Sequence, residues 1–232
     1  MEVKMKFTNP INELSRFEKV LFGLSITLVI LSYIVFGGEI ITLASSLIGA
    51  AALIFVAKGY VIGQVLTVVF AVFYGVISFS FRYYGEMITY LGMTSPMAII
   101  ATVTWIRNPY KKTKEVKVKK MSTTESTVML TFSAAVTVLF YFILKALGNE
   151  SLTVSTFSVT TSFIASYLTF MRSPYYALAY AANDVVLIVL WIIASLTDTS
   201  YVTMAVCFFM FLLNDLYGFI NWRRMMKRQN DS

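Results

Sequence analysis

Eight long apolar segments dominate this 232-residue chain and constrain its fold more than any other feature. Each is long enough to form a helix that crosses the hydrocarbon core of a bilayer, which takes about 17 to 25 residues. They run approximately over 20–37, 40–57, 60–82, 86–106, 127–147, 152–171, 174–196 and 200–222. With 58 % hydrophobic and only 13 % charged residues, the chain carries more apolar surface than one soluble core of this size can bury. The sequence therefore predicts an all-α polytopic membrane protein.

The basic residues lie almost entirely on one side of the predicted membrane. If the N-terminus is cytoplasmic, the basic connection 107–126, Lys58, Arg172 and the tail from Arg223 all lie inside. Because cytoplasmic loops are enriched in Lys and Arg, we expect both termini in the cytoplasm. The net charge of +7 then reflects membrane topology and not nucleic-acid binding. We expect the 107–126 connection to be a solvated linker beside the lipid headgroups.

The two halves of the chain resemble each other. Trp105 and Trp222 end the third apolar segment of each half and are followed by arginine. Because one extra segment separates the two groups of three, both groups run in the same direction. This predicts two parallel three-helix repeats around a linker helix, with a substrate site at their interface. The expected divisions are 1–38 for the N-terminus and an extra helix, 39–108 for the first repeat, 109–150 for the basic loop and linker helix, 151–222 for the second repeat and 223–232 for the tail.

Polar residues within the predicted spans are concentrated in the second half. Polar groups in hydrocarbon are costly unless they meet partners or line a cavity, so intramembrane Asp and Asn indicate a solute path or contacts between helices. Carboxylates, amides and aromatic rings together suit a flat heterocycle that carries a polyol, and Asp would be the counter-ion of a positive ring. The predicted substrate-binding residues are Asp184, Asn214, Tyr217, Asn221, Trp191, Asn183, Asp215, Tyr180 and Gln64.

Other aromatic and acidic residues are interpreted as features of the membrane interface. Trp105 and Trp222 are expected in the cytoplasmic aromatic belt. Tyr90 is expected with its neighbouring tyrosines in an outer belt, where Glu86 would pair with Arg82. Each predicted site residue has a structural alternative, in which it only forms hydrogen bonds between helices.

The sequence contains none of the motifs that would indicate an enzyme. Histidine is absent and Cys207 is the single cysteine, which excludes His-based catalysis, a disulfide within the chain and a thiolate metal site. There is no phosphate-binding glycine loop and no Gly-x-Ser-x-Gly motif. We predict no enzymatic activity, no cofactor and no metal.

The chain from about residue 40 to 226 resembles the PnuC family of bacterial vitamin and nucleoside transporters. Asn214, Tyr217, Asn221 and Lys227 match a pattern of the family's nicotinamide riboside members, while Leu212 and Met225 stand where tryptophans would be expected. Further segments that carry the resemblance are Tyr83-Tyr84-Gly85-Glu86, Trp105-Ile106-Arg107-Asn108, Asn183-Asp184 and Leu190-Trp191.

The resemblance implies a fold similar to SWEET sugar transporters, with three plus one plus three helices, often assembled as a homotrimer. It implies facilitated diffusion of nicotinamide riboside across the bacterial inner membrane, with trapping by cytosolic phosphorylation. A deoxynucleoside, thiamine or riboflavin is an alternative substrate. A structural or regulatory membrane protein is the alternative of a different class, and a cavity lined by Asp184 and Asn214 would favour transport over it.

Overall fold

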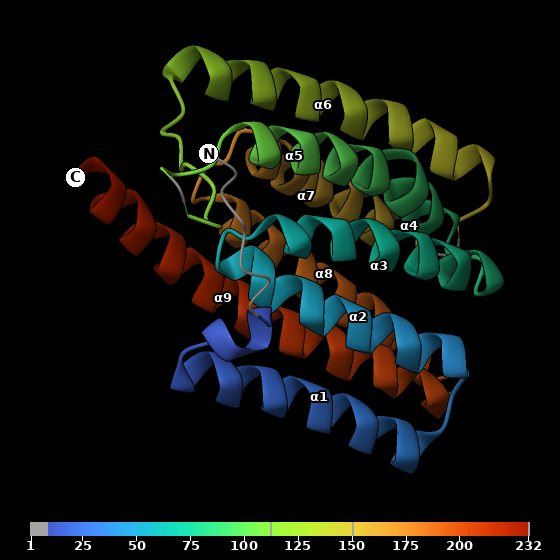
Figure 1. Cartoon of the computed structure of the whole chain (residues 1–232). Helices are drawn as coiled ribbons and strands as arrows, with labels where there is room; N and C mark the ends of the chain where they lie inside the picture. Colours follow the sequence, from blue (N-terminus) through green and yellow to red (C-terminus); the bar gives the residue numbers. More distant parts are fainter. Residues whose placement is uncertain (1–8, 112, 150, 232) are drawn as a thin grey trace.

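The computed structural model describes residues 9–111, 113–149 and 151–231, which form one bundle of long helices (Figure 1). The long helices are α1 (Arg16–Phe36), α2 (Ile40–Ala57), α3 (Val61–Ser80), α5 (Ser95–Arg107), α6 (Thr123–Ala146), α7 (Leu152–Phe170), α8 (Tyr176–Ser195) and α9 (Val202–Asn230). The shorter elements are η1 (Pro10–Glu13), α4 (Tyr84–Ile88), the π-helical η2 (Thr89–Thr94) and η3 (Thr199–Tyr201). Residues 1–8 of the predicted cytoplasmic N-terminus, and Lys112 of the predicted basic loop, lie outside the described residues.

The prediction of a polytopic helical membrane protein is confirmed. Among the described residues, 7 helices are long and apolar enough to cross a membrane, where the sequence predicts eight. The predicted segment 152–171 forms α7, whose Ser and Thr content lowers its hydropathy. The buried polar side chains of α7 are those of Ser155, Ser158, Ser162, Ser166 and Thr169. Many of the polar side chains of α7 therefore point into the protein.

Two helix boundaries differ from the prediction for local reasons. α1 begins at Arg16, before the predicted residue 20, because Ser15 and Glu18 form a reciprocal capping box at its first turn. α9 continues through Asn230, beyond the predicted residue 222 and into the segment predicted as a separate basic tail. Apolarity marks where a helix leaves the membrane, but it does not mark where the helix ends.

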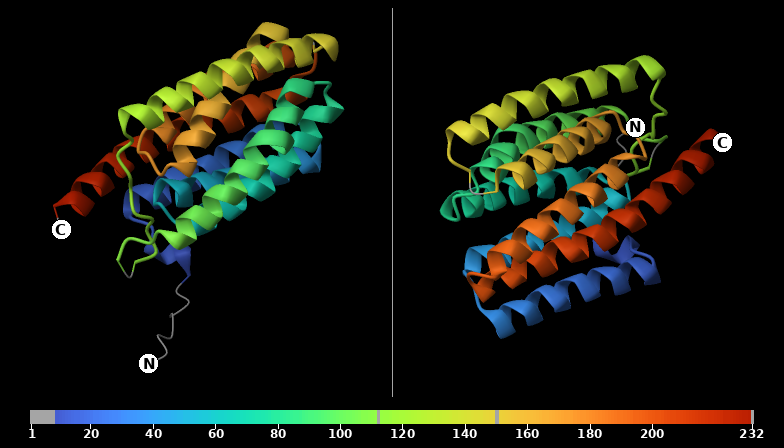
Figure 2. Two further views of the ribbon diagram at one scale, coloured as in Figure 1. Left: turned by 90° about the horizontal axis from the view of Figure 1, so that it is seen from above. Right: turned by 180° about the vertical axis from the view of Figure 1, so that it is seen from behind.

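The two halves of the chain interlock within the bundle. α1 lies at one edge and α6 at the opposite edge, and the other long helices lie between them (Figures 1 and 2). α2 packs against α3 of its own half and against α9 of the other half. In the same way, α7 packs against α8 and against α5. The first helix of each half therefore contacts the last helix of the other half.

The predicted span 86–106 is interrupted by the π-helical turn η2. Pro96 lies in the first turn of α5 and has no backbone N–H, so the carbonyl four residues earlier, at Gly92, loses its usual donor. A π-helical turn is one way to accommodate such a break. The wider turn places Tyr90 and Thr94 beside α3, where they face a cavity.

Candidate functional site

A small cavity lies at the centre of the bundle, between the two halves of the chain. Its volume is about 40 Å³, which is room for a few water molecules at most. It is lined by Gly49, Ala52, Leu53 and Val56 of α2, Gln64, Thr67 and Phe70 of α3, Tyr90 and Thr94 of η2, Tyr180 and Asp184 of α8, and Phe211 and Asp215 of α9. The structure is thus a closed state, and a larger solute would require the two halves to separate.

Asp184 and Asp215 form a pair of buried carboxyl groups in this cavity. Each residue is only 3 % exposed, and both side chains line the same small cavity. The Oδ2 atom of Asp184 and the hydroxyl of Thr94 have no hydrogen-bond partner among the described residues. None of the described residues that line the cavity is a Lys or Arg. The arrangement therefore has unused hydrogen-bonding capacity and no basic side chain to balance a carboxylate.

Four of the predicted site residues line this cavity: Asp184, Asp215, Tyr180 and Gln64. Tyr180 and Gln64 come from opposite halves of the chain, since α8 supplies the first and α3 the second. The aromatic rings in the lining belong to Phe70, Tyr90, Tyr180 and Phe211. Carboxyl, amide and aromatic groups thus meet in one place, as expected for a heterocycle with hydroxyl groups.

The predicted polar ladder of α9 faces α1 and α2 and does not line the cavity. The side-chain amide of Asn214 donates to the Ser25 hydroxyl at 3.0 Å. The Tyr217 hydroxyl donates to a Glu18 carboxylate oxygen at 2.8 Å. Asn221 donates to the Ala57 carbonyl at 2.8 Å. In this closed state, these three side chains attach α9 to neighbouring helices.

Tyr217 and Asn221 also line a second depression, of about 290 Å³, at the end of the bundle near Lys58. Glu18, Arg224 and the loop residue Glu115 lie in the same lining. The predicted ladder therefore faces open space at this end of the bundle.

The remaining predicted residues, Asn183 and Trp191, contact other parts of the bundle. The Asn183 side-chain oxygen accepts a hydrogen bond from Thr161 of α7 at 2.8 Å and lies within 3.2 Å of the Ser158 hydroxyl. The Trp191 indole donates to the Tyr74 hydroxyl at 2.9 Å and packs within an aromatic cluster. Both side chains are buried away from the central cavity.

The structure corrects the interpretation of Tyr90 and Glu86. Tyr90 is not in an outer belt, because it is buried and its ring centroid lies 4.3 Å from that of Tyr74. Glu86 does not pair with Arg82 at the interface, because it is fully buried and accepts a hydrogen bond from Ser158 at 3.0 Å. Pro96 is the sequence signal for this part of the site, since a proline inside an apolar span indicates a local break in the helix.

Trp105 and Trp222 are likewise not belt residues. Both are fully buried, and their ring centroids lie 5.3 Å apart. Trp105 of α5 donates to the Thr169 carbonyl near the end of α7, at 3.2 Å. Trp222 of α9 donates to the Val56 carbonyl near the end of α2, at 2.9 Å. Each tryptophan therefore bonds the first helix of the opposite half.

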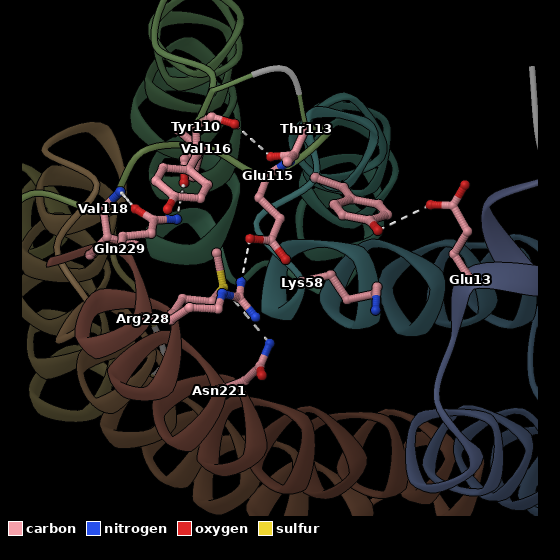
Figure 3. A network of polar contacts seen from close by, with 12 residues as sticks. Glu13, Lys58, Tyr110, Thr113, Glu115, Val116, Val118, Asn221, Arg228 and Gln229 are labelled. Carbon is pink, nitrogen blue, oxygen red and sulfur yellow. Dashed lines mark hydrogen bonds and ion pairs between the residues drawn. The ribbon is translucent and has the colours of Figure 1, made fainter. Parts of the chain in front are cut away.

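The basic connection between α5 and α6 is solvated, as expected, since Lys111, Lys114, Lys117 and Lys120 are exposed, but its backbone also forms an ordered brace between other elements. Its Val116 N–H donates to the Gly59 carbonyl in the α2–α3 turn at 2.9 Å, and its Lys119 N–H donates to the Arg172 carbonyl in the α7–α8 turn at 3.0 Å. Gln229 of α9 accepts from the Val118 N–H at 2.8 Å and donates to the Val116 carbonyl at 3.1 Å (Figure 3).

Ion pairs and one tyrosine extend this brace to neighbouring elements. Arg228 pairs with Glu115 (Figure 3). Lys114 pairs with Glu13. The Tyr60 hydroxyl donates to Glu13 at 3.0 Å. Burial and this hydrogen bond raise the pKa of Tyr60 above its ordinary value, so the tyrosine remains a neutral donor.

Long apolar helices around a small cavity that contains two carboxyl groups define the chain as a multi-pass membrane protein with a candidate site between its halves. Residues 39–224 match the model of a family described as nicotinamide mononucleotide transporter, and the chain belongs to this family. α1 precedes the matched region.

Relatives and a solved structure agree with this assignment. The chain is 24 % identical to the nicotinamide riboside transporter PnuC of Neisseria mucosa over 187 residues, which cover 78 % of this chain and 71 % of the relative. It is also 24 % identical to the PnuC of Haemophilus influenzae over 216 residues, covering 92 % of each. A crystal structure described as the vitamin B3 transporter PnuC superposes with a TM-score of 0.82 at 22 % identity, covering 93 % of this chain and 94 % of that one. That likeness shows the same fold.

Proposed function

We propose that this protein transports nicotinamide riboside across the bacterial inner membrane. The observation that carries the proposal is the cavity between the two halves, where the Asp184 and Asp215 carboxyl groups face aromatic rings and an amide. A pyridinium ring would stack on the aromatic side chains, and a carboxylate would balance its positive charge. Gln64 and Thr94 offer hydrogen bonds to the ribose hydroxyls.

The charge of the cavity favours the riboside over the mononucleotide. A mononucleotide carries an additional phosphate group, which proteins usually bind with Arg, Lys or backbone N–H groups at a helix N-terminus. The described cavity lining contains two Asp residues and neither Lys nor Arg. A phosphate would therefore be repelled by the carboxyl pair, while a cationic riboside would be attracted.

The missing tryptophans do not argue against this substrate in the closed state. Leu212 and Met225 replace the expected tryptophans, and neither side chain lines the central cavity. Phe70, Tyr90 and Phe211 supply rings there instead. Asn214 of α9 supports the alternative of a purely structural role, because its side-chain amide donates a hydrogen bond to Ser25 of α1. A purely structural role fits Asn214 in this state, but it leaves the cavity around Asp184 unexplained.

We further propose alternating access by movement of α2 to α5 against α7 to α9, with α6 as linker and α1 as an additional helix, in the 3+1+3 arrangement. The reciprocal hydrogen bonds of Trp105 and Trp222 support a duplicated scaffold. The distribution of basic residues supports cytoplasmic termini. Assembly as a homotrimer, facilitated diffusion and trapping of the substrate by cytosolic phosphorylation stay predictions from the family resemblance.

Uptake into proteoliposomes tests the proposed substrate. Labelled nicotinamide riboside, nicotinamide mononucleotide, thiamine, riboflavin and deoxynucleosides are compared in parallel. We expect uptake of the riboside, and we expect Asp184→Ala to reduce it about tenfold or more, because hydrogen bonds to charged groups contribute about 1.5–3 kcal/mol. Asp198→Ala is the control, because Asp198 is exposed before η3 and caps it locally. Preferential uptake of another compound would refute the substrate assignment.

A further inference from the structure

One face of the last helix changes from apolar to basic along its length. The positions of this face, at helical spacing, are Leu216, Phe219, Ile220, Arg223 and Lys227. Residues at this spacing lie on one side of an α-helix. Leu216 is 43 % exposed and Ile220 is 49 % exposed, so the bundle does not cover this face of α9. The basic residues lie where the end of α9 projects from the bundle (Figures 1 and 2).

A groove with a volume of about 800 Å³ lies beside the basic part of this face. Tyr175, the residue before α8, lines the groove, and its ring centroid lies 6.0 Å from that of Phe219. Arg223 donates a hydrogen bond to the Tyr175 hydroxyl at 2.8 Å, and its guanidinium carbon lies 5.7 Å from the centroid of the same ring. These two contacts fix one guanidinium group at the groove and leave its other N–H groups available as donors.

The groove carries an excess of positive charge. Among its described lining residues, Arg223, Arg224 and Lys227 are basic and only Asp231 is acidic. No acidic side chain in the described part of the chain forms an ion pair with these three basic residues. By contrast, Arg228 on the same helix is paired with an acidic residue of the brace. The groove therefore presents unpaired positive charge at the point where the exposed apolar face of α9 ends.

We propose that this groove binds the headgroup of an anionic phospholipid, whose acyl chains lie along Leu216 and Ile220. α9 is long and apolar enough to cross the membrane, so its exposed apolar face lies against acyl chains and its basic end lies at the level of the headgroups. A guanidinium group binds phosphate oxygens through paired N–H donors, and Lys adds a point charge. Basic pockets beside transmembrane helices bind anionic headgroups in this way.

The continuity of the two surfaces favours a lipid over a soluble phosphate ester. A soluble ester would contact the basic residues alone and would leave the apolar face of α9 uncovered. A lipid contacts both parts of the face at once, because its charged headgroup and its acyl chains are covalently joined. The inference is independent of which solute the protein transports, since the groove and the central cavity have no lining residue in common.

Native mass spectrometry of the full-length wild-type protein in detergent tests the lipid site. Phosphatidylglycerol and phosphatidylcholine with identical acyl chains are titrated in parallel, since the choline ammonium neutralises the phosphate of the second lipid. We expect phosphatidylglycerol to bind about tenfold more tightly or more, because each Lys or Arg near an anionic lipid contributes about fivefold in affinity. A higher ionic strength should reduce this difference, because exposed charges are screened. Glycerol phosphate, which lacks acyl chains, should not displace the lipid.

A matched pair of triple variants locates the site. In the first, Arg223→Gln, Arg224→Gln and Lys227→Gln are combined, and glutamine is compatible with the helix. We expect this variant to lose the preference for phosphatidylglycerol. The control removes the same number of positive charges from exposed positions at the same end of the bundle, by Arg16→Gln, Lys117→Gln and Lys120→Gln. The control should keep the preference. Light scattering of the same samples reports the oligomeric state.

Each other outcome contradicts the proposal in a distinct way. Equal affinity of the wild type for the two lipids, or an equal loss of preference in both variants, would show that the groove is not a specific lipid site. Displacement by glycerol phosphate would assign the groove to a soluble phosphate ester. A smaller oligomer in the first variant, with its lipid preference unchanged, would assign the groove to a second copy of the chain. The proposed transport of a riboside would stand in all of these cases.

Discussion

At the scale of single residues, the closed cavity depends on a glycine that leaves room for an aromatic ring. A Cβ added at Gly49 of α2 would lie 2.2 Å from the Cζ atom of Phe211 and 3.0 Å from the Phe70 ring. Both rings belong to the cavity lining, so they have little space to move without filling it. The size of one side chain therefore sets the distance between α2 and α9.

We expect Gly49→Ala to destabilise this closed state by about 1–3 kcal/mol, the usual cost of overpacking a core, and to lower the rate of riboside uptake. Thermal unfolding in detergent and proteoliposome uptake measure the two effects. Gly23→Ala is the control, because a Cβ at Gly23 of α1 meets nothing within 4 Å and alanine favours the helix. Equal unfolding temperatures for the two variants would contradict the proposed packing constraint.

At the scale of elements, α1 is attached to the rest of the bundle by a buried carboxylate. Glu18 is 2 % exposed, pairs with Lys58 at 3.2 Å and accepts a hydrogen bond from Tyr217. Asn214 adds a second attachment through Ser25. The polar ladder of α9, which first indicated a substrate path, thus holds a helix that lies before the family match.

Removal of this carboxylate should loosen α1. Glu18→Ala leaves the Lys58 ammonium and the Tyr217 hydroxyl without their acceptor, and loss of one partner of a buried ion pair typically costs about 3–5 kcal/mol. We expect a lower unfolding temperature and faster proteolysis in the connection between α1 and α2. Glu39→Ala is the matched control, because Glu39 is exposed in that connection and forms no capping hydrogen bond with its side chain. A loss of stability no larger than that of the control would argue against the attachment.

At the scale of the whole molecule, the brace between α5 and α6 connects the two halves at one end of the bundle. Val116 and Lys119 bond the α2–α3 turn and the α7–α8 turn, and Gln229 holds the brace to α9. If the halves move apart during transport, some of these hydrogen bonds must break. The strength of the brace should therefore influence how readily the closed state opens at this end.

Gln229→Ala tests this role. The substitution removes both hydrogen bonds to the brace, and the Val118 N–H loses its acceptor. We expect amide exchange at Val118 to become up to about tenfold faster, because the lost bond contributes about 0.5–1.5 kcal/mol, while the Val116 N–H keeps its bond to Gly59. Exchange measured by mass spectrometry in detergent reports the change. Asn230→Ala alters the next, exposed residue and should leave the exchange rates unchanged. Slow exchange in the Gln229 variant would show that the backbone bonds to the two turns are sufficient.

The sequence by itself determined the class of the protein and the positions of its helices, because crossing a bilayer imposes a length and an apolarity that a single chain displays directly. It also indicated Asp184 and Asp215, since a carboxyl group in an apolar span has few explanations other than function.

Only the tertiary structure decided which side chains face the cavity. Asn214, Tyr217 and Asn221 share the helical spacing that predicted a site wall, yet they face α1 and α2, while Asp215 on the same helix faces the cavity. Tyr90 and Thr94 reach the cavity through the π-helical turn before Pro96. Helical periodicity specifies which residues share a face, but the partner of that face depends on packing between segments far apart in the sequence.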